Sequence, residues 1–109
     1  MARYVTIGKY TAATVQALLK SPSDREAATR AAISAAGGTL EGWYYAPETG
    51  EVFAISTFED ETAASALLLA ISATGATEPS SRATRVLTGS EFAELCRQAA
   101  STSYTAPGR

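Results

Sequence analysis

The chain has 109 residues, 46% of them hydrophobic and 18% charged, a balance typical of one small globular domain. Its formal net charge at pH 7 is −2 and its nine basic residues are scattered singly, which argues against binding to nucleic acids or anionic membranes. The lack of histidine, with a single cysteine, excludes Ser-His-Asp and Cys-His catalysis, histidine-ligated metals and an intramolecular disulfide.

The first predicted element is a β-strand over residues 3–10, in which Val5 and Ile7 alternate with polar and aromatic residues. Because Val5 and Ile7 are the most apolar pair of this strand, we place them against the helices of the same chain. The alternate residues are then expected to face the space between two subunits: Tyr4, Thr6, Gly8 and Tyr10.

A short helical turn and a longer alanine-rich helix are expected next. Val15, Leu18 and Leu19 are spaced to share one face of the short turn. Two starts are open for the longer helix: a Ser21-Pro22 cap, or a capping box between Ser23 and Glu26. The pair of glycines at 37 and 38 is expected to end it.

A β-hairpin is predicted with strands at about 39–45 and 51–58, and Gly50 supplies the positive φ angle of the turn. Because strand side chains alternate between faces, Trp43 and Tyr45 share one face and Tyr44 points to the other. On the second strand we assign Phe53 and Ile55 to the core. The opposite face of that strand then carries Ala54 and Ser56.

A second long helix is predicted after an Asp60 cap, and Gly75 ends it. Its apolar stripe follows helical spacing: Ala64, Leu67, Leu68 and Ile71. A fourth strand is expected over residues 82–87. A capping box of Thr88 and Glu91 then opens a last helix, whose apolar stripe is Phe92, Leu95, Cys96 and Ala99.

The order β-α-β-β-α-β with a C-terminal helix predicts an α+β, ferredoxin-like fold, one antiparallel sheet with its helices on one face. We expect a single domain over residues 1–100 and a disordered tail over 101–109. The free face of the sheet needs cover that this chain does not supply. A homodimer, or a higher assembly of the same chain, is the economical solution.

The chain resembles the GYD domain family, small bacterial proteins of the dimeric α/β-barrel group within the ferredoxin-like folds. The resemblance covers about residues 3–96. It rests on pieces in the family's order and spacing: YVTIGKYT, the SP-x-x-R segment from Ser21 to Arg25, Gly37-Gly38, the aromatic strand leading to Gly50-Glu51, FEDETAA and LTGSEF. It implies a dimeric α/β-barrel assembly.

The signature for which this family is named departs from the pattern here. The family carries a short G-x-Y-D run, and the corresponding residues are Gly50, Glu51, Val52 and Phe53. Since only the glycine is present, the roles of the family tyrosine and aspartate are not transferred to this chain.

The candidate ligand-binding side chains are aromatic or carry hydroxyl groups: Tyr4, Thr6, Tyr10, Trp43, Tyr45 and Ser56. A pocket for a small apolar or aromatic ligand needs such walls. The same residue types are common in cores and subunit interfaces, so a purely structural role stays open. No metal or cofactor is expected, because the carboxylates near the hairpin fit a solvated turn and the glycines match no phosphate-binding motif.

Two functions follow from this sequence. The first is a homo-oligomeric small-ligand-binding or accessory module of uncharacterised role. The alternative is a cofactor-free enzyme of the monooxygenase, cyclase or isomerase type found in the wider barrel group, acting on an aromatic or polyketide-like substrate in the dimer barrel. Its acid and base would be Tyr4, Tyr10, Tyr44, Tyr45 or a buried Glu41. A third case is an interaction protein whose aromatic residues are all interface.

Cys96 lies in an apolar helical stripe, where a thiol without a histidine neighbour acts as a small hydrophobic side chain. The most apolar run, residues 63–73, is shorter than the 20 or so residues that a membrane span needs. The N-terminal residues lack a stretch of signal-peptide length. A cytoplasmic, soluble protein is therefore expected.

Overall fold

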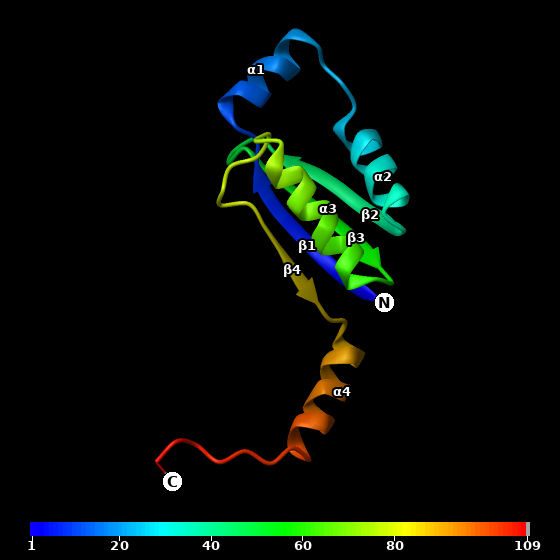
Figure 1. Cartoon of the computed structure of the whole chain (residues 1–109), viewed down its shortest axis with the longest axis vertical. Helices are drawn as coiled ribbons and strands as arrows, with labels where there is room; N and C mark the ends of the chain where they lie inside the picture. Colours follow the sequence, from blue (N-terminus) through cyan, green and yellow to red (C-terminus); the bar gives the residue numbers. More distant parts are fainter. Residues whose placement is uncertain (109) are drawn as a thin grey trace.

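The computed structural model describes residues 1–108 and contains, in this part of the chain, one four-stranded antiparallel sheet and four helices (Figure 1). The strand order is β2-β3-β1-β4. The strands are β1 (Ala2–Lys9), β2 (Gly38–Ala46), β3 (Glu51–Phe58) and β4 (Arg82–Val86). The helices are α1 (Ala12–Lys20), α2 (Arg25–Ala35), α3 (Glu61–Ala73) and α4 (Gly89–Ala100). The predicted α+β class and antiparallel sheet are confirmed, and the topology is consistent with a ferredoxin-like fold.

A small core joins one face of the sheet to helices α2 and α3. Its buried side chains come from both helices and from the two hairpin strands: Ile33, Leu40, Ala54, Phe58 and Ala64. Tyr4 of β1 packs edge-on against the Phe58 ring, with the two ring centroids 6.2 Å apart. Helix α1 lies beyond the end of the sheet, and α4 continues from β4 away from the body (Figure 1).

Capping side chains mark the starts of the helices, and the predicted start of α2 is wrong. The start of α2 is neither predicted cap: Asp24 is the N-cap, and its carboxylate accepts a 3.1 Å hydrogen bond from the Ala27 amide. A carboxylate is a strong cap because it also meets the positive end of the helix dipole. The predicted caps Asp60 and Thr88 are confirmed, as is the positive φ of Gly50.

The predicted faces of β1 and β3 are wrong, and the two faces are exchanged. Tyr4 is paired with Ser56, and Thr6 with Ala54. Ala54 and Ser56 are buried beneath the helices at 8% and 4% exposure. By strand alternation, Val5, Ile7, Phe53 and Ile55 therefore lie on the face turned away from α2 and α3.

The error has a physical reason. Alternation gives the period of a strand, but the inward face is identified only when the other face is polar. Here the middle of the sheet carries apolar residues on both faces. We call the uncovered side the open sheet face, and define it by Val5, Ile7, Tyr44, Phe53 and Ile55. Tyr44 is paired with Phe53 and is 65% exposed, so the predicted split between Tyr44 and Trp43 is confirmed.

The surface of this chain is large for its mass. A compact monomer of 11.3 kDa exposes about 5,700 Å², whereas this chain exposes 7613 Å². The radius of gyration is 17.4 Å, against about 13 Å for a compact domain of this length. Much of the apolar surface of this chain is therefore unburied within a single copy.

The described helices include none with the length and hydropathy required to cross a membrane. Residues 101–108 contain neither a helix nor a strand. The disorder of residues 101–109 stays a prediction, and Arg109 lies outside the described residues.

Replacing Gly38 by alanine should destabilise the fold. A methyl group at Gly38 would lie 2.6 Å from the Phe58 ring and 2.8 Å from the Thr57 carbonyl oxygen. Overpacking of this kind lowers the free energy of unfolding by about 1–3 kcal/mol, which urea denaturation measures. Gly89→Ala is the matched control, because a methyl group there meets open space at the start of α4. Equal losses in both variants would contradict the close packing of Gly38 on Phe58.

Candidate functional site

A cleft of about 700 Å³ lies between the helix-covered face of the sheet and helices α2 and α3. We call it the sheet–helix cleft. Five of the six predicted ligand-binding residues line it, all from the sheet or its continuation: Tyr4, Thr6, Tyr10, Trp43 and Ser56. The structure thus brings these five residues together. The sequence analysis placed them between two subunits, whereas they lie between the sheet and the helices of one chain.

Tyr45 is the exception among the predicted site residues. It does not line the cleft, and its side chain is 48% exposed near the hairpin turn. Its hydroxyl would lie 3.9 Å from a methyl group at Gly50. Val52 is its strand partner, and Val52 lines the cleft although sequence reasoning gave it no role.

Small residues on both sides leave the room for this cleft. Gly8, Thr6 and Ser56 contribute little volume on the sheet side. Helix α2 contributes Ala28 and Ala32. Larger apolar side chains close the remaining wall from α2 and α3: Ile33, Leu67, Leu68 and Ile71. The walls are thus mostly apolar, with a few hydroxyl groups, as in sites for small organic ligands.

The loop before β4 closes one end of the cleft. The amide of Glu78 donates a 2.8 Å hydrogen bond to the Lys9 carbonyl, and the Lys9 amide donates to Ser81 Oγ at 3.3 Å. The Thr11 amide donates to the Ala76 carbonyl at 3.0 Å. Because these bonds tie the loop to the end of β1, the cleft wall they form has a fixed position. Sequence reasoning missed this role, since Pro79 and its neighbours carried only a loop signal.

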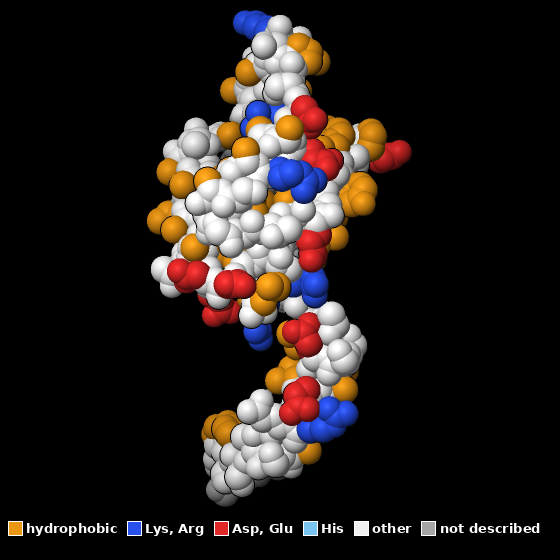
Figure 2. Space-filling view, turned by 90° about the vertical axis from the view of Figure 1, so that its right-hand side faces the viewer, with side chains coloured by type: hydrophobic (Ala, Val, Ile, Leu, Met, Phe, Trp, Pro, Cys, Tyr) orange, Lys and Arg blue, Asp and Glu red, His pale blue; other side chains and the backbone are white. Residues whose placement is uncertain are grey.

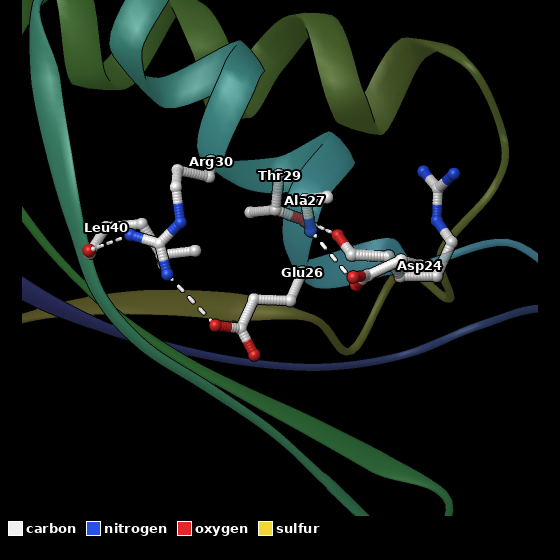
Figure 3. A network of polar contacts seen from close by, with 7 residues as sticks. Asp24, Glu26, Ala27, Thr29, Arg30 and Leu40 are labelled. Carbon is white, nitrogen blue, oxygen red and sulfur yellow. Dashed lines mark hydrogen bonds and ion pairs between the residues drawn. The ribbon is translucent and has the colours of Figure 1, made fainter.

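Arg30 holds α2 to the sheet at an irregular point of β2 (Figure 3). The register of β2 on β3 shifts between Leu40 and Gly42, which interrupts the regular ladder. Arg30 Nη1 donates a 2.8 Å hydrogen bond to the Leu40 carbonyl, and Nη2 donates to Glu26 at 2.9 Å. This fork fixes the α2 wall of the cleft relative to the bulged strand.

Most of the predicted acid and base residues lie outside the cleft. Glu41 is exposed and pairs with Arg3 at 3.1 Å, so the predicted burial of Glu41 is wrong. This pairing raises the pKa of Arg3, through the Glu41 hydrogen bond and charge. Tyr44 and Tyr45 are exposed. Tyr4, Tyr10 and Glu78 are the phenols and carboxylate that line the cleft among residues 1–108.

The chain can be assigned to a known protein family. The model of the GYD domain matches residues 4–96, and the chain belongs to this family. No curated protein and no solved structure matches it. The family identity is therefore established, and it agrees with the resemblance in the sequence.

Removing the Arg30 fork should loosen the α2 wall. Arg30→Met keeps the aliphatic stem and is expected to lower the free energy of unfolding by about 1–2 kcal/mol, because the Leu40 carbonyl loses a charged donor. Glu26→Gln should change it by less than about 0.5 kcal/mol, since the Glu26–Arg30 ion pair is exposed. Urea denaturation of both variants measures the difference. Similar losses would show that the ion pair, and not the bond to the strand, carries the contact.

Proposed function

We propose that this member of the GYD domain family is a small-ligand-binding or accessory module that takes an apolar or aromatic compound into its sheet–helix cleft. The observation that carries this proposal is the convergence of Tyr4, Thr6, Tyr10, Trp43 and Ser56 on one cleft of about 700 Å³. Pockets for small organic molecules have volumes of about 300–1,000 Å³ and mostly apolar walls. The proposed site is thus of the right size and chemistry.

The polar groups of the cleft suggest how a ligand is oriented. Thr6 and Ser56 offer hydroxyl groups from neighbouring strands, and Tyr4 and Tyr10 offer phenols. Such groups donate to or accept from a carbonyl or hydroxyl of an aromatic compound. Trp43 supplies an aromatic wall on which a planar ring packs.

We also propose that the protein works as a homodimer of the α/β-barrel type, with the open sheet face as the contact. Val5, Ile7 and Ile55 are half-buried within one copy, and Tyr44 is exposed. An apolar sheet face of this kind is covered in stable proteins by helices or by another sheet. The large surface of the single chain supports the same assembly.

The alternative function is a cofactor-free enzyme that acts on an aromatic or polyketide-like substrate in the same cleft. Its support is the position of Tyr4 and Tyr10, whose phenols line the cleft, together with Glu78 at its closed end. A conversion of ligand that is lost in Tyr4→Phe or Tyr10→Phe, while ligand binding is kept, would favour the enzyme over the binding module.

Filling the cleft should weaken ligand binding. The chain has one tryptophan, and Trp43 lines the cleft, so its fluorescence reports occupancy directly. The probe is 1-naphthol, added in a titration to the full chain. Thr6→Leu adds volume to the floor of the cleft and is expected to raise the Kd by at least about tenfold, or about 1.4 kcal/mol.

Thr39→Leu is the matched control, because Thr39 lies on β2, is exposed and is not part of the cleft. Its Kd should equal that of the unmodified protein. If the unmodified protein shows no saturable change in Trp43 emission with 1-naphthol or with related two-ring compounds, the binding proposal is wrong.

A charge on the open sheet face should separate the subunits. Ile7→Lys places an ammonium group in the centre of this apolar face, and a buried unpaired charge costs several kcal/mol. Sedimentation velocity should therefore show dimer for the unmodified chain and monomer for Ile7→Lys. Ser34→Lys is the control, because it adds the same charge on an exposed position of α2. Dimer in both variants would place the contact elsewhere.

A further inference from the structure

Helix α4 forms an arm that packs on no other helix or strand within residues 1–108. It leaves the end of β4 and lies apart from the sheet and the other helices (Figures 1 and 2). None of its twelve residues is buried. Its two largest apolar side chains are open to solvent, with Phe92 exposed at 60% and Leu95 at 48%.

The arm nevertheless has the pattern of a helix that packs on something. Its apolar residues recur at helical spacing on one side: Phe92, Leu95, Cys96 and Ala99. Glu94 and Arg97 lie away from this stripe and pair with each other at 2.9 Å. An isolated helix of this length is marginal in water, so its stability has to come from contacts along the apolar side.

The start of the arm is fixed by its cap. Thr88 Oγ1 accepts from the Glu91 amide at 3.2 Å, and the Glu91 carboxylate accepts from the Thr88 amide at 2.9 Å. The hydrogen bond from the Thr88 amide, followed by that of the Thr88 hydroxyl, lowers the pKa of the Glu91 carboxyl, so the cap is formed at neutral pH. Between β4 and α4 only Leu87 and Thr88 intervene. The chain reversal that would fold α4 back onto its own sheet would therefore have to be made within this two-residue connection.

We propose that the apolar stripe of α4 packs on the body of a second copy of this chain, so that two copies exchange their arms. The exposed surface exceeds that of a compact monomer by about 1,900 Å². A standard stable interface buries about 800 Å² on each partner. The excess therefore accommodates both an open sheet face and an exchanged arm.

The size of the arm and the symmetry of the exchange both fit a second copy of this chain as the partner. Twelve helical residues span about 18 Å, and a strand of eight residues spans about 26 Å, so one arm lies within the dimensions of one body. In a twofold dimer each copy gives one arm and receives one, and the assembly closes without forming chains. This inference rests on the self-association proposed above and adds the arm to it.

The lone cysteine provides the experiment. Cys96 lies on the stripe and is exposed in one copy, and the chain has no other cysteine. A water-soluble maleimide reacting with the full chain therefore reports the state of the arm alone. In the dimer the reaction should be at least tenfold slower than in urea-unfolded protein. In the monomeric Ile7→Lys variant it should return to the unfolded rate.

A matched pair of substitutions tests the stripe itself. Leu95→Asp places a charge on the stripe, and Gln98→Asp adds the same charge to an exposed position beside it. Sedimentation equilibrium should show at least a tenfold higher dimer dissociation constant for Leu95→Asp and little change for Gln98→Asp. Equal effects would overturn the exchange of arms.

The outcomes separate the arm from the dimer. A dimer in which Cys96 reacts as fast as in unfolded protein would overturn the exchange and leave the sheet contact intact. A monomer with a protected Cys96 would show that the arm folds onto its own body, which also overturns the proposal. A monomer with a reactive Cys96 would overturn both the exchange and the dimer.

Discussion

The constraint on which this structure depends is a single antiparallel sheet with two apolar faces. One face is covered by α2 and α3, and the core formed there is small: Ile33, Leu40, Ala54, Phe58 and Ala64. The other face, with Val5, Ile7 and Ile55, has no cover from the described chain. Since an apolar sheet face is stable only when it is covered, the proposed dimer follows from this one deficit.

The helix-covered face of the sheet carries both packed aromatic side chains and the sheet–helix cleft. Phe58, Trp43 and Tyr4 supply large aromatic surfaces, while alanines on α2 and small residues on β1 leave a volume of about 700 Å³ unfilled. The apolar walls of an open cleft stay in contact with solvent unless another group covers them. This exposed apolar lining is the basis of the proposed ligand site.

The segment that follows the hairpin turn contributes apolar side chains to both sides of the sheet. Val52 lines the sheet–helix cleft. Phe53, the next residue, lies by alternation on the open sheet face. One short stretch of β3 thus takes part in both of the surfaces on which the proposed function rests.

Local chemistry was readable in the sequence: the caps at Asp60 and Thr88, the turn at Gly50, the order of elements, and the grouping of Tyr4, Thr6, Tyr10, Trp43 and Ser56. These follow from residue type and period, which act over a few residues. Only the tertiary structure decided that this group lies beneath α2 and α3, that Glu41 is exposed, and that α4 stands free. The position of this group depends on which face of the sheet the helices cover, and strand alternation carries no information on that choice when both faces contain apolar residues.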